Sequence, residues 1–440
     1  MILDALFRSR QRAASALGIP RTIRHTISLC RSLLSERGEI SGGQLATEAL
    51  QAYHSLDEPS RAGFFDLLVK EFSPEPEEVG RSGDAYRNDP SAVNLARLLR
   101  VAEPPRQELF RRLNMAPGGI RTLLEMRSHL LRQLSGNPQW ASIEADLAHL
   151  LTSWFNRGFL VMQRIDWQTP AIILEKLIQY EAVHEIQGWP DLRRRLETDR
   201  RCYGFFHPAL EHEPIIFLEV ALTRGMSAKV QPLLDPVSPV VDPKSANCAV
   251  FYSITNCQDG LRGVPFGNLL IKKVAEDLGR ELPQIRTIAT ASPVPGFRQW
   301  LNKTVNAPEK HSRYAGLASL AAMLARPEWL NDMQTSEVAQ RELGSSCAYY
   351  LLRAKQGKEP LDSVARFHLR NGARLERINW LGDTSAAGIE RSAGLMVNYV
   401  YRLADVERNH ELYMKQYKIV ASRQIESLAK ESIFLRRDRS

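Results

Sequence analysis

The sequence predicts an α+β protein in which an all-helical N-terminal region precedes a domain built on a mixed β-sheet. Three observations support this prediction. Apolar residues recur at helical spacing through the first part of the chain, short β-branched and aromatic runs begin after Trp189-Pro190, and a glycine-rich turn then leads into an amphipathic helix and a buried strand. We expect a helical domain at residues 1–185 and a mixed-sheet domain at residues 186–440.

The helical region is identified by its spacing. Between residues 143 and 154, apolar side chains follow one another at steps of four, three, one and three, which places them on one helix face. A similar stripe lies at residues 123–134, after the break at Pro117-Gly118-Gly119. Residues 73–78 and 101–105 are expected to be loops, and no repeat period indicates a solenoid.

Strands are expected in the second region. Residues 202–206, 215–221 and 249–254 are short, rich in aromatic and β-branched side chains, and bounded by proline, glycine or aspartate. A helix at 268–278 and a strand at 285–290 follow the glycine-rich turn, so the sheet is expected to be mixed and to contain a crossover helix. The later elements are expected as helices at 314–356, 361–369 and 407–434 and a strand at 373–381.

Composition limits the class of protein. The chain has 440 residues, with 58 Lys and Arg against 50 Asp and Glu, a formal net charge of +8 and a hydrophobic fraction of 44%. These values exclude disordered, collagen-like and disulfide-stapled chains. No apolar run approaches the ~20 residues that a membrane helix needs. The five cysteines lack metal-ligand spacing, so we expect neither a zinc site nor a disulfide framework.

We expect the protein to be cytoplasmic. The start of the chain lacks a long apolar stretch with a small-residue cleavage site, so a secretory signal is not expected. The C-terminus carries no Ser-Lys-Leu address. An arginine-rich start resembles a transit peptide, but we favour a basic, partly helical surface arm. Its arginines are Arg8, Arg10, Arg12, Arg21, Arg24 and Arg31.

The turn Gly260-Leu-Arg-Gly-Val-Pro-Phe-Gly267 is a candidate phosphate site. A glycine-rich loop that opens a helix presents unpaired N–H groups and the positive end of the helix dipole. The spacing fits neither a Walker loop nor a Rossmann fingerprint, and a tight turn without ligand is the alternative. With its preceding strand and following helix, the turn resembles the coenzyme A pyrophosphate loop of the Gcn5-related N-acetyltransferase fold, although its glycine spacing differs. The expected coenzyme A contacts are Arg262, Gly263, Gly267 and Asn268.

Four phrases resemble the malonyl-CoA decarboxylase family, in that family's order, over about residues 176–402. They are Tyr180-Glu-Ala-Val-His184 with residues 201–203 and 213–223; residues 251–254 through 260–263 to 270–272; Ala291-Ser-Pro-Val-Pro-Gly-Phe297; and Phe367-His-Leu-Arg-Asn-Gly-Ala373 with residues 377–380 and 394–401. The resemblance implies a catalytic domain of the acetyltransferase fold that converts malonyl-CoA to acetyl-CoA and carbon dioxide without metal or prosthetic group. The implied partners are malonyl-CoA and further copies of the chain, joined through the helical domain. We expect neither a nucleic-acid nor a membrane partner.

The resemblance also implies active-site residues. The family's catalytic serine falls on Ser292, its catalytic histidine on His368, and a third active-site position on Tyr401. Some members carry a catalytic glutamate between the loop glycines, where this chain has Pro265. Each of the three matched residues also has an ordinary structural interpretation: a turn-capping serine, a histidine bonded to a carbonyl, and a half-buried tyrosine.

Decarboxylation of a malonyl thioester must orient one C–C bond, stabilise one enolate oxygen and deliver one proton to C2. A backbone N–H of the strand at 249–254 is the expected donor to the thioester oxygen. Ser292, held extended by Pro293, either donates a hydrogen bond to the carboxylate or attacks as a nucleophile with His368 as its base. We expect His368 near a helix C-terminus, where the dipole favours the imidazolium form and a general-acid role. Tyr401 is expected to orient His368 or the carboxylate.

Two other functions stay open from the sequence. An acyl-CoA acyltransferase of the same fold would bind an amine instead of a malonyl carboxylate. A basic helical nucleic-acid-binding or scaffold protein would account for the net charge, although the chain has no zinc-finger or RRM-like signature. The basic residues 193–195 and 200–201 are expected either to meet the 3′-phosphate of coenzyme A or to form a solvated face.

Overall fold

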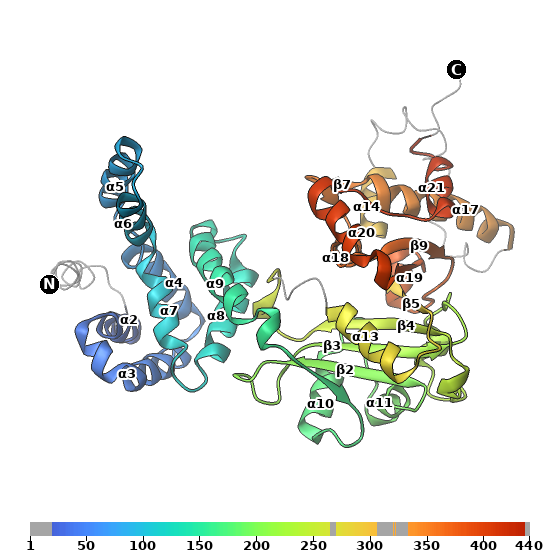
Figure 1. Cartoon of the computed structure of the whole chain (residues 1–440), viewed down its shortest axis with the longest axis horizontal. Coiled ribbons are helices and arrows are strands. Elements are labelled where there is room, and N and C mark those ends of the chain that lie inside the picture. Colours follow the sequence, from blue (N-terminus) through green and yellow to red (C-terminus); the bar gives the residue numbers. More distant parts are fainter. Residues whose placement is uncertain (1–19, 265–269, 306–319, 321, 323–332, 436–440) are drawn as a thin grey trace. The chain divides into compact units, whose positions relative to one another are not determined.

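The computed structural model describes residues 20–264, 270–305, 320, 322 and 333–435 (Figure 1). Contacts divide the chain into two compact units. The first comprises Met1–Val161, Phe206–Ile215 and Gln258–Phe266, and the second comprises Met162–Phe205, Ile216–Cys257 and Gly267–Ser440. The division lies near Val161, not after residue 185, because β1 (Val161–Ile165) already joins the sheet.

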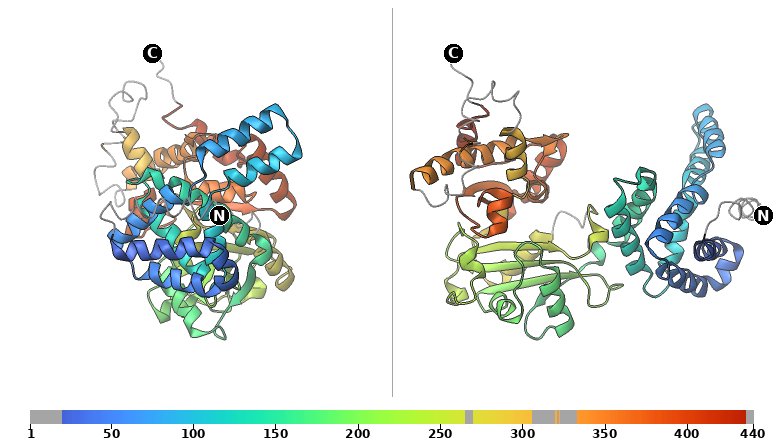
Figure 2. Two further views of the ribbon diagram at one scale, coloured as in Figure 1. Left: turned by 90° about the vertical axis from the view of Figure 1, so that its left-hand side faces the viewer. Right: turned by 180° about the vertical axis from the view of Figure 1, so that it is seen from behind.

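The first unit is helical, as predicted. Its helices are α2 (Arg21–Leu34), α3 (Glu36–His54), α4 (Glu58–Glu71), α5 (Pro76–Asn88), α6 (Ala92–Ala102), α7 (Pro105–Leu113), α8 (Gly119–Gln133) and α9 (Ala141–Trp154). The expected loop at 73–78 is shorter than predicted, because Pro76 opens α5 in the first turn, where a missing N–H breaks no hydrogen bond. α5 and α6 pack together as a hairpin that projects from the rest of the unit (Figure 2).

The apolar stripes found in the sequence form the core of this unit. Leu123 of α8 and Ile143 and Leu147 of α9 are fully buried, which confirms the expected helix faces. The rings of Phe65 and Trp140 lie beside them in an aromatic cluster, with centroids 5.3 Å apart. The helices are therefore stabilised mainly by burial of one face against their neighbours.

The second unit is built on the predicted mixed sheet. Its strand order is β1-β2-β3-β4-β5-β10-β6, with β9 paired to the other side of β10. The strands are β2 (Arg200–Phe206), β3 (Pro214–Thr223), β4 (Cys248–Asn256), β5 (Thr287–Thr290), β6 (Ser292–Pro293), β9 (Arg374–Asn379) and β10 (Met396–Tyr401), beside a separate hairpin of β7 (Lys355–Gln356) and β8 (Glu359–Pro360). The expected strands at 202–206, 215–221, 249–254, 285–290 and 373–381 are confirmed to within a few residues at their ends.

β4 and β5 are parallel, and α13 (Leu270–Glu281) supplies the predicted crossover between them. Pairing runs from Cys248 opposite Thr287 to Phe251 opposite Thr290 and then stops. β4 continues to Asn256 along β3, whereas the other strand turns into β6, which pairs with β10. The two parallel strands therefore part after Phe251, as the resemblance to the acetyltransferase fold implies.

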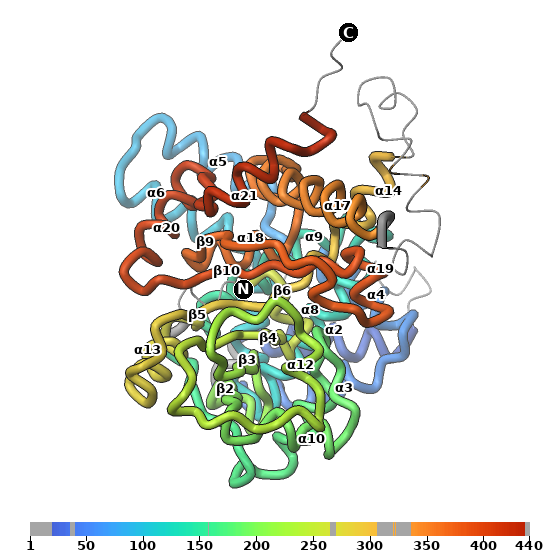
Figure 3. The backbone as a smooth tube through the Cα atoms, turned by 90° about the vertical axis from the view of Figure 1, so that its right-hand side faces the viewer, coloured from blue at the N-terminus to red at the C-terminus, as the bar shows by residue number. Residues whose placement is uncertain are grey.

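Sequence analysis did not predict β10, nor did it predict β1, β7 and β8. β10 lies between β5 and β6 on one side and β9 on the other, all antiparallel to it (Figure 3). The helices of this unit are α10 (Ala171–Tyr180), α11 (Trp189–Arg195), α12 (Gln231–Leu234), α13, α14 (Phe297–Val305), α17 (Met333–Arg353), α18 (Ser363–Arg370), α19 (Ala386–Ser392), α20 (Leu403–Gln416) and α21 (Arg423–Lys430). The single helix expected at 407–434 is two helices, because Tyr417 ends α20 in a left-handed conformation with φ 53°.

The helix expected at 314–356 is described only in part, since most of residues 314–332 lie outside the described residues. The five cysteines are free thiols. Within the described part of the chain, no helix has the length and apolar character needed to cross a membrane.

Candidate functional site

Ser292, His368 and Tyr401 meet in the second unit and form one hydrogen-bonded chain. Ser292 Oγ lies 2.9 Å from Nε2 of His368, and the opposite ring nitrogen, Nδ1, lies 2.8 Å from the hydroxyl of Tyr401. The three residues come from β6, α18 and the end of β10. All three side chains are buried.

Local structure fixes the positions of Ser292 and His368. Ser292 pairs with Val397 of β10, which holds its backbone extended. α18 starts at a cap, in which Asp362 accepts the N–H of Ala365 at 2.8 Å. The helix ends before Gly372, whose φ of +80° favours glycine and which lies so close to the carbonyl of Val406 that no side chain fits. His368 therefore lies in the last turn, as expected.

Two further residues complete the chain. The Ser292 hydroxyl donates to Thr290 Oγ1 at 2.8 Å, and Thr290 Oγ1 also accepts the backbone N–H of Tyr399 at 3.1 Å. Because the Ser292 proton is used in this way, Ser292 Oγ accepts from Nε2–H of His368, and Nδ1 accepts from Tyr401. The imidazole stacks on the ring of Tyr399 at 4.5 Å, which holds its plane.

The charge state of His368 corrects a prediction. The imidazolium form was expected from the helix dipole, but burial lowers the pKa of His368 to about 3. Burial likewise raises the pKa of Tyr401 well above its ordinary value. A helix end acts on an exposed charge by about 0.3–1 kcal/mol, and that is too little to offset removal of the ring from water. At neutral pH the three hydrogen-bonded side chains, Ser292, His368 and Tyr401, are therefore uncharged.

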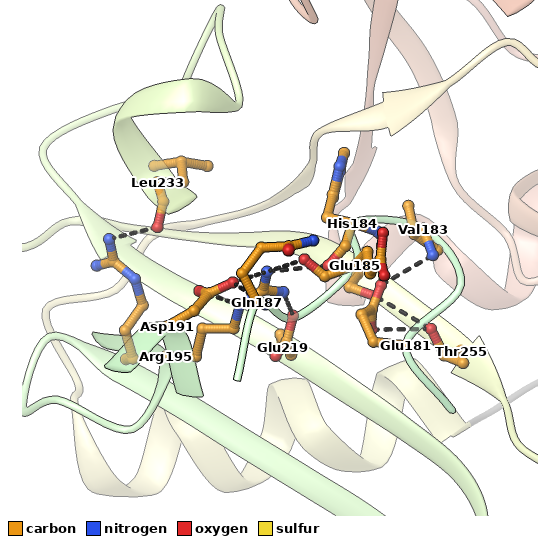
Figure 4. Close-up of polar contacts among 12 residues, drawn as sticks. Glu181, Val183, His184, Glu185, Gln187, Asp191, Arg195, Glu219, Leu233 and Thr255 are labelled. Atoms are coloured by element: carbon orange, nitrogen blue, oxygen red, sulfur yellow. Dashed lines mark hydrogen bonds and ion pairs between the residues drawn. The ribbon is translucent and has the colours of Figure 1, made fainter. Parts of the chain in front are cut away.

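After Phe251, where β4 and β5 separate, two side chains of β4 are hydrogen-bonded to the carboxylate of Glu181. Ser253 Oγ donates to the Glu181 carboxylate at 2.8 Å, and Thr255 Oγ1 donates to it at 3.1 Å. The same carboxylate accepts the backbone N–H groups of Val183 and His184 (Figure 4). Because residues 248–251 are paired with β5, the backbone donor expected at 249–254 is confined to the part after Phe251.

The glycine loop is described as far as Val264. Gly263 adopts φ +80°, which fits the tight turn predicted there. The Arg262 side chain is exposed, with its nearest carboxylate, Asp259, 3.5 Å away. Gly260 has a different role, because a methyl group there would approach the main-chain oxygen of Leu124 in α8 to 2.2 Å. Gly267, Asn268 and Pro265 lie outside the described residues.

Four of the five arginines at 193–195 and 200–201 do not form a phosphate surface, which corrects one of the two interpretations given to them; the fifth, Arg193, is exposed. Arg195 is 1% exposed and binds Asp191 and Glu219, both at 2.9 Å (Figure 4). Arg194 pairs with Asp199 at 2.6 Å. Arg200 and Arg201 are also buried and bind Asp199 and Glu281. The alternative, a solvated face, is equally wrong for these four, because each has exchanged water for carboxylate oxygens inside the unit.

Sequence analysis missed Thr290, Tyr399 and Glu181. A usable signal existed for the first two, since residues two apart in a strand share a face, and these two precede Ser292 and Tyr401 by that spacing. Glu181 lies within the phrase Tyr180-Glu-Ala-Val-His184, but no local pattern indicated its role, because its side-chain partners Ser253 and Thr255 are more than 70 residues away. In the described ranges, no group of three His, Cys, Asp or Glu side chains is placed to hold a metal ion.

Comparisons with known proteins identify the family. The model of the malonyl-CoA decarboxylase C-terminal domain matches residues 158–438, and that of the N-terminal domain matches residues 72–155. A mitochondrial malonyl-CoA decarboxylase of Anser anser anser is 34% identical over 419 residues, 88% of this chain and 83% of the relative.

Two crystal structures of malonyl-CoA decarboxylases are also similar. The Rhodopseudomonas palustris structure has a TM-score of 0.88 at 48% identity and covers 93% of this chain and 100% of its own. The Agrobacterium vitis structure has a TM-score of 0.86 at 44% identity, with 92% and 99% covered. The matched residues extend over both units, and the chain belongs to the malonyl-CoA decarboxylase family.

Proposed function

We propose that this protein converts malonyl-CoA to acetyl-CoA and carbon dioxide, with Ser292, His368 and Tyr401 as its catalytic residues. The observation that carries the proposal is the uncharged chain from Tyr401 through His368 to Ser292, in a member of this family. The acetyltransferase-like sheet supports it, because β4 has a backbone edge that β5 leaves free after Phe251. The proposal includes neither a metal nor a prosthetic group.

In the proposed reaction the Ser292 hydroxyl turns from Thr290 Oγ1, to which it donates in the free protein, and donates its hydrogen bond to the malonyl carboxylate, which fixes the bond to be broken. As this C–C bond breaks, carbon dioxide leaves and the electron pair passes to the thioester as an enolate, whose oxygen a β4 N–H stabilises. C2 then takes a proton through the Ser292 hydroxyl, which regains one from Nε2 of His368. Tyr401 donates to Nδ1 and so fixes the Nε2–H tautomer before the reaction. As Nε2 gives up its proton, Nδ1 takes the proton of the Tyr401 hydroxyl, so the imidazole stays neutral, and solvent returns a proton to Tyr401.

A nucleophilic Ser292 is the competing mechanism within the same function. It would require His368 to accept the serine proton, and a base whose pKa is about 3 is poorly matched to that task at neutral pH. We therefore prefer the hydrogen-bond donor. Mass spectrometry of the enzyme quenched during turnover separates the two, because only the nucleophile leaves a malonyl or acetyl group on Ser292.

Substrate binding is proposed at the glycine loop. Arg262, Gly263, Gly267 and Asn268 would bind the pyrophosphate of coenzyme A through the exposed guanidinium and backbone N–H groups. The exposed Arg262 and the left-handed Gly263 support this for the described half of the loop.

We also propose that copies of the chain associate through the α5–α6 hairpin. α6 has no buried residue, and its apolar Val93 and Leu99 are 78% and 63% exposed. The hairpin carries acidic Glu77 and Glu78 on α5 and basic residues on α6, so two copies can complement each other. Light scattering of Leu99→Asp against the parent chain tests this, with loss of the oligomer expected.

A cytoplasmic location is proposed as well, and cell fractionation checks it.

The decisive experiment follows acetyl-CoA and carbon dioxide from malonyl-CoA at neutral pH in the presence of EDTA. Ser292→Ala is expected to lower kcat at least about 10²-fold, the size typical for losing an oriented donor. Ser432→Ala, another buried serine, is the matched control and should retain activity. If the parent chain binds coenzyme A but leaves malonyl-CoA intact, the proposed function is wrong.

A further inference from the structure

The loop that carries Arg262 and Gly263 is held by a buried arginine of the helical region. Arg127 of α8 is 3% exposed. Its Nη1 donates to the carbonyl of Gly260 at 2.6 Å, and its Nη2 donates to the carbonyl of Arg262 at 2.9 Å. On its other side, Glu144 of α9 accepts from Nε at 3.0 Å and from Nη2 at 2.6 Å. One guanidinium thus joins two helices to the loop backbone.

A second contact presses the same loop against the same helix. The backbone of Gly260 lies so close to the main-chain oxygen of Leu124 that a Cβ would come within 2.2 Å of it. Leu124 and Arg127 are three residues apart in α8 and therefore share a face. The loop rests on that face, and glycine at 260 is needed for close approach.

The direction of the Arg127 bonds decides where the loop N–H groups point. The carbonyl of Arg262 and the N–H of Gly263 belong to one planar trans peptide, so they point in opposite directions. Because Arg127 takes the carbonyl, the Gly263 N–H is turned away from the guanidinium. That N–H has no acceptor in the described part of the chain, although the neighbouring N–H groups of Arg262 and Val264 bond to Asp259 and Leu261.

We propose that Arg127 is a positioning residue for coenzyme A binding: by fixing two loop carbonyls it aims the Gly263 N–H at the pyrophosphate of the substrate. This inference rests on the proposed binding of coenzyme A at the loop. Glu144 balances the charge of Arg127, so the contribution is one of orientation rather than of long-range attraction. The helical region is thereby required for substrate affinity as well as for association.

Arg127→Lys tests the proposal, because lysine keeps the charge but cannot bind two carbonyls and a carboxylate with a planar fork. The KM for malonyl-CoA and the Kd for coenzyme A are expected to rise about tenfold, which is the size of one lost hydrogen bond. The kcat is expected to change less than about twofold. Malonyl-pantetheine, which lacks the pyrophosphate, should be converted equally well by variant and parent.

Arg112→Lys is the matched control. Arg112 also binds a glutamate, Glu108 at 2.8 Å, and a main-chain carbonyl, that of Leu33 at 2.6 Å, but both lie in helices away from the loop. Its KM should stay at the parent value. Gly260→Ala, which lifts the loop from α8, should raise KM as Arg127→Lys does, whereas Gly279→Ala, where a methyl group has open space, should not.

An unchanged Kd for coenzyme A in a folded Arg127→Lys would overturn the inference. So would an equal loss with malonyl-CoA and malonyl-pantetheine, which indicates general damage. Calorimetric titration with coenzyme A keeps this test separate from the proposed reaction. A parent chain that binds coenzyme A without decarboxylation refutes the reaction alone, and one that does not bind coenzyme A refutes both.

Discussion

Two clusters of polar side chains are buried in the second unit, and they satisfy their polar groups in opposite ways, one by neutral hydrogen bonds and the other around a buried cation. The Ser292–His368–Tyr401 chain contains no charged partner, and burial alone displaces the pKa of His368. The second cluster surrounds Arg195 with Asp191 and Glu219, at 2.9 Å each (Figure 4). A neutral chain of donors and acceptors permits a proton to shift without separating charges, whereas an ion cluster fixes its members. The comparison assigns chemistry to the first and architecture to the second.

Replacing His368 should produce the largest effect on the reaction. His368→Gln keeps a polar group near Ser292 but cannot relay a proton between two nitrogens. We expect kcat to fall about 10²- to 10⁴-fold, the range for loss of an acid–base group, with the melting temperature nearly unchanged. Steady-state kinetics and thermal unfolding measure both. Activity within tenfold of the parent would remove His368 from the mechanism and erase the contrast between the clusters.

Arg195→Met should do the reverse of His368→Gln: it should lower the stability of the protein and leave kcat nearly unchanged. Removing the cation leaves the Asp191 carboxylate buried without its partner and takes away the donor to Glu219, which typically costs about 3–5 kcal/mol of unfolding free energy. Denaturant unfolding should show this loss, while kcat per folded molecule stays close to the parent value. A stable variant with low kcat would mean that the ion cluster takes part in the chemistry.

Tyr401→Phe should have an intermediate effect. The ring and its packing remain, but Nδ1 of His368 loses its donor at 2.8 Å, and the tautomer that faces Ser292 is no longer fixed. We expect kcat to fall about tenfold to 10²-fold, since an unpaired buried acceptor costs about 1–3 kcal/mol. KM for malonyl-CoA should change little. A rise in KM for malonyl-CoA with unchanged kcat would instead mean that Tyr401 contributes to substrate binding.

The smallest effect on the reaction is expected from Glu219, whose influence appears in the pH dependence of stability. Burial, with help from Glu181 and Asp191 and against the pull of Arg195, raises the pKa of Glu219 from 4.5 to about 8. Its Oε1 has no hydrogen-bond partner among the described residues, as a protonated carboxyl allows. The folded protein thus binds a proton that the unfolded chain releases near pH 4.5. Stability should therefore fall as pH rises from about 4.5 to about 8.

Glu219→Gln removes this dependence and should change the unfolding free energy little at pH 5. His368 has the opposite sign: the unfolded chain binds its proton below about pH 6.5 and the folded protein only near 3, so its contribution is lost as pH falls through that range. Unfolding free energies of parent, Glu219→Gln and His368→Gln between pH 4 and 8 measure both slopes. Parallel curves for all three would contradict both assignments.

Much of the architecture follows from local pattern. The helical stripe at 143–154, the strand at 249–254 and the crossover helix after the glycine turn were predictable because side-chain period is set by backbone geometry. β10 was missed, although residues 396–401 form the same kind of short aromatic and β-branched run, buried on both faces, as the predicted strands β2 and β4. Ser292, His368 and Tyr401 were identified by family resemblance, and they lie more than 30 residues apart in sequence.

The sequence by itself determined the two-part organisation and the turn at Gly263, and through family resemblance it selected the three candidate catalytic residues, because periodicity, glycine requirements and family phrases are properties of short segments. Only the tertiary structure decided that His368 is neutral, that Arg195 is internal and that Gly260 lies on α8. These properties depend on how much water is removed and which distant group replaces it. Burial and pairing arise from packing of remote segments, so no local pattern encodes them.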